Sequence, residues 1–271
     1  MTAAAFPTEA GAPNSPSLRE RFVGMIVSPR KVFQGLNSED AWLWPAIMLL
    51  VGYMVYYIPV GLQTARFSGG MFGNILTNTP TSADQSSKRV LDFMASYMPA
   101  FQLFSMVAYV PFAAALSWAT RTVCFTVLGR MLSPHRPPVG RVIAMIGWAW
   151  VPILFQYVGV GLAMLFIPEV TRFLMPMPDI KDAQMNVEAL NRNRWQAQML
   201  LELSPFVIWN IVLCVIGVSE VFKLPRWKSA IVVLVPTAAQ VLFQLAIYFL
   251  SQSMLNLSGG MANPTVPPPG R

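Results

Sequence analysis

Long apolar runs alternate with polar segments along the whole chain. Five of these runs reach the ~20 apolar residues that a helix needs to cross the hydrocarbon core of a bilayer. Because lipid offers the backbone no hydrogen-bond partners, each run is predicted to be a helix. The pattern therefore predicts an all-α, polytopic transmembrane helix bundle of about five spans. These expected spans cover residues 42–62, 98–128, 142–167, 205–221 and 230–250 of a transmembrane domain at 41–251.

The polar segments differ in kind. Residues 1–17 and 252–271 are rich in small residues, Pro and Gly, and are predicted to be disordered tails. The connection at 63–97 is rich in Gly, Ser, Thr and Asn, which predicts a flexible loop that gives way to the second helix from about residue 88. The connection after the third span contains strong helix formers at 183–203. They predict an amphipathic surface helix or an early extension of the fourth span.

A basic amphipathic segment at 18–40 precedes the first span. Its first part places Leu18, Phe22 and Met25 on one helical face. Ser28 and Pro29 then match an N-cap followed by proline at the first helical position. We expect two short helices that lie on the inner membrane surface or pack under the bundle. A partly ordered linker is the alternative.

Composition supports the membrane assignment. Of the 271 residues, 55% are hydrophobic and 11% are charged, and mean hydropathy is +0.50. A soluble domain has about 25% charged residues, so this chain has too few to cover a surface in water. Lys and Arg are densest in the N-terminal segment and in the links near residues 130–141 and 223–228. By the positive-inside rule these segments face the cytoplasm, with the N-terminus inside and the C-terminus outside. The net charge of +7 then matches an anionic inner leaflet better than nucleic acid.

Three stretches in a fixed order resemble the Yip (Ypt/Rab-interacting) family, in its bacterial branch. They are Ser28-Pro-Arg-Lys-Val-Phe-Gln-Gly-Leu36, Gly140-Arg-Val-Ile-Ala-Met-Ile-Gly-Trp-Ala-Trp-Val-Pro152 and Trp209-Asn-Ile-Val-Leu-Cys-Val-Ile-Gly-Val-Ser-Glu-Val-Phe222, the last followed by Lys228-Ser229-Ala230. The resemblance implies a five-helix integral membrane protein, here in the bacterial cytoplasmic (inner) membrane. Eukaryotic members bind Rab-type GTPases and have an N-terminal acidic-aromatic motif. This chain lacks that motif, so the resemblance implies no GTPase binding.

Basic residues supply the first set of candidate contacts. Arg30, Lys31 and Arg121 are candidates for binding a lipid headgroup or a partner protein. Counting from Met98, Arg121 lies ~35 Å along the second helix, past a hydrocarbon core of ~30 Å. We therefore expect its side chain to extend to the inner interface. The alternative places it inside the span, where an ionisable residue marks a functional site.

Side-chain amides supply the second set. The residues are Gln156, Asn210, Gln240 and Gln244. Amides within spans predict interhelical hydrogen bonds, and a polar lining for a pathway is the alternative. Prolines such as Pro152 interrupt several spans and predict kinks.

The sequence contains no recognisable catalytic motif, and we expect no catalytic residue, cofactor or bound metal. Cys124, Cys214 and His135 have no metal-binding spacing. The sequence therefore favours a non-enzymatic membrane scaffold or organiser, or a partner-binding protein. The expected partners are membrane lipids and other membrane proteins or a second copy of the chain. A small-molecule or lipid transporter is the main alternative, and a lipid-modifying enzyme ranks below both.

Overall fold

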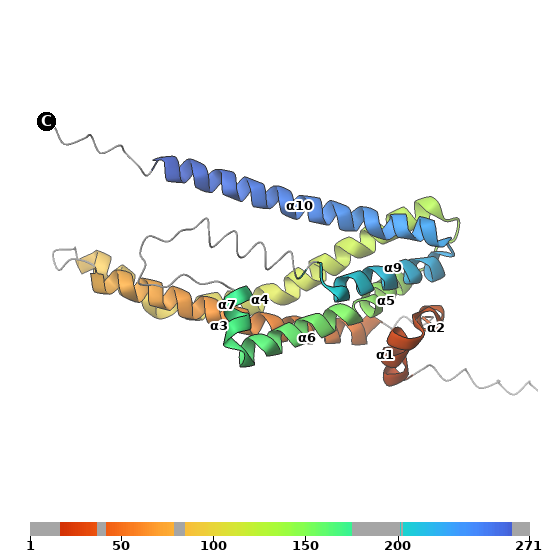
Figure 1. Ribbon diagram of the computed structural model, residues 1–271, viewed down its shortest axis with the longest axis horizontal. Coiled ribbons are helices and arrows are strands. Elements are labelled where there is room, and N and C mark those ends of the chain that lie inside the picture. Colours follow the sequence, from red (N-terminus) through yellow and green to blue (C-terminus); the bar gives the residue numbers. More distant parts are fainter. Residues whose placement is uncertain (1–16, 37–41, 79–84, 175–200, 202, 262–271) are drawn as a thin grey trace, which may run out of the picture.

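The computed structural model describes residues 17–36, 42–78, 85–174, 201 and 203–261. Throughout this part of the chain the regular structure is helical, which confirms the predicted all-α bundle (Figure 1). The helices are α1 (Leu18–Val27), α2 (Pro29–Gln34), α3 (Leu43–Asn78), α4 (Gln85–Leu132), α5 (Val139–Ala149), α6 (Val151–Phe166), α7 (Pro168–Leu174), α9 (Pro205–Phe222) and α10 (Arg226–Met261).

Four of the described helices are long and apolar enough to cross a membrane, namely α3, α4, α9 and α10. The pair α5 and α6 provides a fifth crossing if it is one broken span, with a bend of 41° between the two helices. The third expected span therefore consists of two helices. These crossings make the chain an integral membrane protein.

Three helices are longer than a bilayer requires. The apolar part of α4, Lys88–Leu132, has 45 residues and is about 68 Å long, against a hydrocarbon core of about 30 Å. The flexible loop expected from residue 63 is wrong over its described residues up to about 87, because α3 continues to Asn78 and α4 starts at Gln85. The expected early start of the second helix near residue 88 is confirmed. Similarly, α10 continues to Met261, past the expected end of the fifth span. The amphipathic helix expected at 183–203 lies almost wholly outside the described residues.

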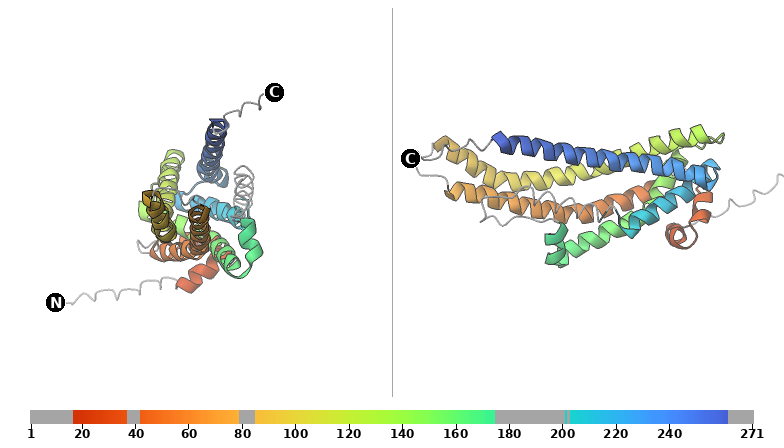
Figure 2. Two further views of the ribbon diagram at one scale, coloured as in Figure 1. Left: turned by 90° about the vertical axis from the view of Figure 1, so that its left-hand side faces the viewer. Right: turned by 45° about the horizontal axis from the view of Figure 1, so that its top comes forward.

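Packing of α3 on α4 explains why the loop prediction failed. The two helices run side by side as a hairpin (Figures 1 and 2). At Gly69 an added Cβ would lie 3.1 Å from Cγ of Pro99, so the glycine lets the helices approach closely. In membrane helices small residues serve such contacts. Gly69, one of the glycines that suggested a loop, is therefore a helix-packing residue here.

The two N-terminal helices pack against the bundle. Ser17 caps α1 in a capping box with Glu20, and hydrogen bonds from the backbone N–H and the hydroxyl of Ser17 lower the pKa of the Glu20 carboxyl. Phe22 meets Phe155 of α6 edge to face, with ring centroids 5.6 Å apart. Phe33 of α2 is fully buried beside Gly217 of α9. Of the two placements expected for this segment, the structure has it docked under the bundle.

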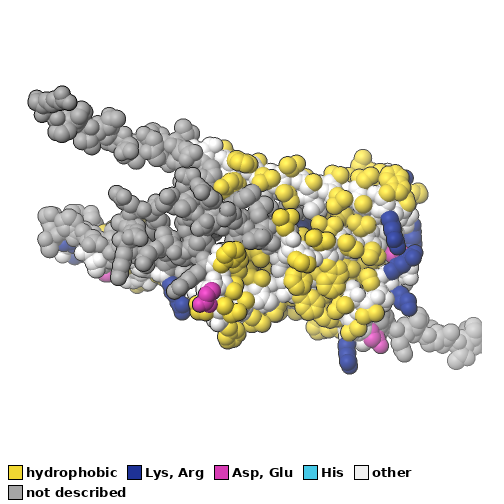
Figure 3. All heavy atoms as spheres, viewed as in Figure 1, with side chains coloured by type: hydrophobic (Ala, Val, Ile, Leu, Met, Phe, Trp, Pro, Cys, Tyr) yellow, Lys and Arg dark blue, Asp and Glu magenta, His cyan; other side chains and the backbone are white. Residues whose placement is uncertain are grey.

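The packed core lies toward one end of the molecule, which we call the basic end. This end comprises α2, the links 133–138 and 223–225, and the helix ends that they join. There Ser133 donates a hydrogen bond to the backbone carbonyl of Phe222, which ties the two links together. Figure 3 shows Lys and Arg side chains gathered at this end, next to a mostly hydrophobic surface. The largest buried side chains of the core are Trp148, Phe33, Phe125 and Phe222.

Two glycines of α6 allow a matched test of the helix contact between α3 and α6. A Cβ at Gly161 would collide with the carbonyl oxygen of Val55 and lie 3.0 Å from the Cα of Tyr56, whereas a Cβ at Gly159 would meet nothing within 4 Å. We expect Gly161→Ala to lower the free energy of unfolding by about 1–3 kcal/mol through overpacking. Gly159→Ala should be neutral or stabilising by up to about 1 kcal/mol, because alanine favours helix. Unfolding by denaturing detergent measures both; equal effects would contradict the α3–α6 contact.

Candidate functional site

The break between α5 and α6 is the starting point of the candidate site. Pro152 has no backbone N–H, and its ring clashes with a carbonyl one turn earlier, so the helix is interrupted there. The interruption leaves the carbonyl of Ala149 available, and Asn210 of α9 donates its Nδ2–H to this oxygen at 2.7 Å. Asn210 is buried. In lipid a freed carbonyl needs such a partner, so Asn210 makes the break tolerable.

Arg121 of α4 binds the other side of the same amide. Its Nη1 donates to Oδ1 of Asn210 at 3.5 Å, and its Nη2 donates to Oε1 of Gln240 of α10 at 3.4 Å. The guanidinium carbon also lies 4.9 Å from the centroid of the Trp150 ring, within cation–π range. Both hydrogen bonds are near the upper limit of length, so each is weak. We call Arg121, Trp150, Asn210 and Gln240 the Arg121 cluster.

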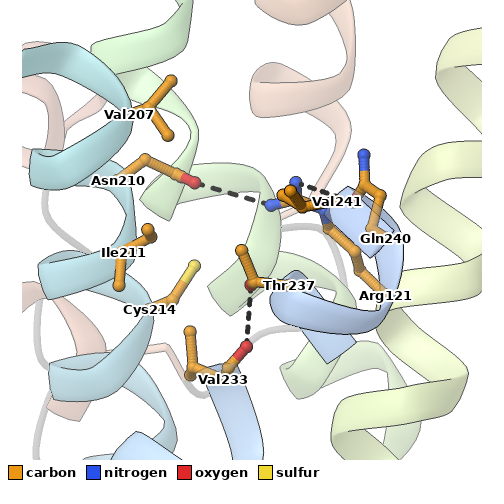
Figure 4. Close-up of a pocket in the computed structure, with 9 residues that line it drawn as sticks. All are labelled: Arg121, Val207, Asn210, Ile211, Cys214, Val233, Thr237, Gln240 and Val241. Atoms are coloured by element: carbon orange, nitrogen blue, oxygen red, sulfur yellow. Dashed lines mark hydrogen bonds between the residues drawn. The ribbon is translucent and has the colours of Figure 1, made fainter. Parts of the chain in front are cut away.

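The guanidinium points away from the basic end. Gly129 of α4 packs against Phe222 of α9, so these two residues lie at about the same height along the bundle. Arg121 lies about 12 Å from Gly129 along α4. Asn210 lies about 18 Å from Phe222 along α9, so it is farther from the basic end than the backbone of Arg121. Figure 4 shows Arg121 extending in the direction in which α10 runs from Val233 to Val241. Its hydrogen-bond partners, both neutral amides of other helices, lie on the side away from the basic end. The expectation that the side chain extends to the inner interface stays a prediction.

A small cavity of about 30 Å³ adjoins the cluster. Arg121, Asn210, Gln240, Thr237 and Cys214 supply its polar lining, and valines and an isoleucine supply the rest (Figure 4). The Thr237 hydroxyl donates to the Val233 carbonyl of its own helix at 2.7 Å. A water needs about 10–15 Å³ of such volume, so the cavity has room for about two or three waters.

The remaining predicted amides lie outside the cluster. Gln156 is buried, donates to the Leu201 carbonyl at 3.0 Å and accepts from the Ser204 hydroxyl at 2.8 Å. These bonds fasten α6 to the start of α9. Gln244 lies one turn beyond Gln240, and its Oε1 is buried without a hydrogen-bond partner among the described residues.

A second group of polar residues lies at the basic end. Glu220 accepts hydrogen bonds from Nε of Arg30 and, at 3.0 Å, from Nε2 of Gln34, and Nζ of Lys223 is 4.0 Å away. Arg30, a candidate lipid contact, thus ties α2 to α9 although two thirds of its side chain is exposed. Lys31 is exposed. We call Arg30, Gln34 and Glu220 the α2 latch.

Sequence reasoning did not connect Trp150 with Arg121 or Arg30 with Glu220. The first pair joins residues of α4 and of the α5–α6 break, and the second joins residues 190 positions apart. The only local signal for the first was Pro152, which marks the break. Among the described residues no group of three or more His, Cys, Asp or Glu side chains is placed to hold a metal ion.

Replacing Asn210 tests the hydrogen bond at the break. Asn210→Leu leaves the Ala149 carbonyl buried and unpaired, and should lower the free energy of unfolding by about 1–3 kcal/mol. Gln240→Leu removes only a long bond on an exposed side chain and should cost about 0.6 kcal/mol or less. Unfolding in denaturing detergent compares the two variants. A larger loss for Gln240→Leu would contradict the role given to Asn210.

The α2 latch predicts a local change. Glu220→Gln removes the charge that faces Arg30 while keeping the shape of the side chain. Because Arg30 is exposed and water can solvate it, we expect a loss of about 1 kcal/mol, seen as roughly fivefold faster hydrogen exchange of α2 amides. Lys31→Gln on the same helix is the control and should leave exchange unchanged. Identical exchange in both variants would show that Glu220 does not hold α2.

Comparison with known proteins identifies one family. Residues 23–248, which include α3, both parts of the broken span and the whole Arg121 cluster, match the Yip1 domain. The comparisons with curated proteins and with solved structures find no significant match. The match covers most of the 271 residues, and it includes all three stretches on which the resemblance was based. The chain therefore belongs to the Yip1 domain family.

Proposed function

We propose that this protein is a non-enzymatic membrane scaffold that binds other membrane proteins along α4 and α10. The observation that carries the proposal is the uneven burial of the spans. Within the apolar windows of α3 and α9, 39% and 44% of residues are buried, compared with 6% for α4 and 11% for α10. Two long helices thus have little of their surface covered by the rest of the described chain.

Exposed apolar side chains on α4 and α10 fit lipid as well as protein, so their chemistry alone does not decide between them. The limited packing of α10 favours protein. Between helices in lipid no hydrophobic effect acts, and helices are positioned by close packing and hydrogen bonds. Contacts made by α10 are mainly with α9 and, less extensively, with α4 (Figure 2). Although α3 holds α4 on one side, few residues of α4 are buried, so a partner can pack against both helices and supply the contacts that position α10.

We further propose that the basic end faces the cytoplasm in a bacterial inner membrane. The α2 segment and both basic links lie at this one end, as the positive-inside rule requires of cytoplasmic segments. Exposed Lys31 is then positioned to contact anionic lipid. This orientation places the N-terminus inside, and the C-terminus outside if the α5–α6 pair crosses.

Transport receives no comparable support. A polar pathway through the bundle would need room beside its amides, and the cavity beside Gln240 is about 30 Å³. Ligand pockets are typically ten times larger or more.

Site-specific photo-cross-linking tests the scaffold. A photoreactive amino acid replaces Phe112 of α4 or Phe243 of α10, which are both exposed, and cells are irradiated before extraction. We expect discrete protein adducts from both positions. The controls are the exposed positions Leu165 of α6 and Ile208 of α9, which should give lipid adducts only. Lipid adducts alone at all four positions, or the same protein adducts from all four, would contradict the proposal.

A further inference from the structure

Arg121 is an incompletely neutralised cation within a helix that is long and apolar enough to cross a membrane. A guanidinium has five N–H donors, and two of them meet neutral amide oxygens at 3.4 and 3.5 Å. No carboxylate of the described residues forms an ion pair with it, whereas Glu220 is paired at the basic end. A charge at this depth is costly unless an opposite charge accompanies it. The guanidinium can therefore donate hydrogen bonds to an anionic oxygen that binds at the cluster.

The cluster reaches the sparsely packed side of the bundle. Gln240, which binds Nη2 of Arg121, is exposed on α10. Arg121 itself is half-buried on α4. Of the four single-helix candidate spans, these two have the smallest buried share in their apolar windows. An anionic group that approaches laterally between α4 and α10 therefore meets the guanidinium without crossing the packed core.

The direction of the side chain disfavours a lipid headgroup as that anion. Headgroups lie at the interface, and an arginine that binds one extends toward it. The backbone of Arg121 lies about 12 Å along α4 from Gly129, which packs against Phe222 near the basic end. From there the side chain extends toward Asn210, which is still farther from the basic end. A lipid phosphate would have to leave the interface to reach it.

A second copy of the chain has no suitable carboxylate among its described residues. Asp92 lies about 44 Å of helix from Arg121, and Glu20 is on α1 outside the spans. Glu169 follows the far end of α6, and Glu220 belongs to the α2 latch. Two copies in one bilayer share one orientation, so each of these carboxylates lies at a different height in the membrane from Arg121 of the other copy.

We propose that the Arg121 cluster binds the carboxylate of an Asp or Glu side chain within a transmembrane helix of a partner protein, which packs against α4 and α10. The guanidinium fork binds a carboxylate through two parallel N–H donors, and Gln240 turns its amide to donate as well. The apolar faces of the two helices contact the rest of the partner helix. This inference rests on the proposed scaffold function and gives the partner its chemistry.

The test uses the purified full-length protein in phosphatidylcholine vesicles at pH 8. The probe is a fluorescent leucine–alanine transmembrane peptide with a single central Glu, and the matched peptide has Gln there. Energy transfer between the protein and the peptide measures binding. We expect the Glu peptide to bind at least tenfold more tightly than the Gln peptide, because the ion pair forms in a low-dielectric environment. Arg121→Gln should reduce binding of the Glu peptide to the level of the Gln peptide.

Two controls distinguish a carboxylate site at Arg121 from a general effect of basic charge and from a lipid site. Arg130→Gln alters an exposed arginine of the same helix and should leave the tenfold preference intact. Since the two peptides are compared on unaltered protein, a variant that fails to fold does not weaken the test. Loss of the preference on adding phosphatidylglycerol would overturn the inference in favour of a lipid site. Equal binding of both peptides would overturn it too, even if the cross-links from Phe112 and Phe243 form, so the two proposals fail separately.

Discussion

The hydrogen bond from the Asn210 amide to the Ala149 carbonyl is the interaction on which the centre of this bundle depends. A bilayer offers no water to a carbonyl at the helix break beside Pro152, so the broken third span requires a donor from a neighbouring helix. Asn210 supplies it at 2.7 Å, which fixes α9 against the break. With the Nδ2 of the amide directed at the carbonyl, its Oδ1 faces Arg121 and accepts a hydrogen bond from Nη1. One buried amide thus sets both the position of α9 and the direction of the arginine.

The buried core lies at the basic end of the molecule, and the helices toward the other end are more exposed. At the basic end Phe33 lies close to Gly217 and the α2 latch adds an ion pair, so α1, α2, α5 and α9 form one packed unit. Away from that end the helices continue as long rods, with α10 standing beside the others (Figures 1 and 2). The packed end stabilises the fold, and the long helices α4 and α10 leave most of their apolar surface uncovered by the described residues. A protein that recognises others within the membrane needs this combination, because a partner can pack on the free surface without disturbing the core.

Sequence reasoning predicted what depends on local composition and missed what depends on contacts between helices. Apolar runs revealed the spans because the length of a crossing is set by the bilayer. The loop expected from residue 63 is a helix as far as Asn78, because Gly69 has a packing partner in Pro99 that composition does not show. The partners of Arg121 are missed for a related reason. Counting along one helix treats the interface as the nearest polar environment, and it does not show that Asn210 and Gln240 on other helices offer polar atoms to the guanidinium.

The charge of Arg121 is not required by the fold that surrounds it. Asn210 pairs with the Ala149 carbonyl through its own N–H group, so a neutral residue at position 121 would leave the break satisfied. Translocon-based scales place the cost of an arginine at the centre of a span at about 2.5–3.5 kcal/mol. Two long hydrogen bonds to neutral amides and the contact with the Trp150 ring offset part of this cost without supplying an opposite charge. By contrast, the buried Glu220 has Arg30 as its counter-ion within the chain. No described carboxylate forms an ion pair with Arg121, and the proposed partner carboxylate would supply that opposite charge.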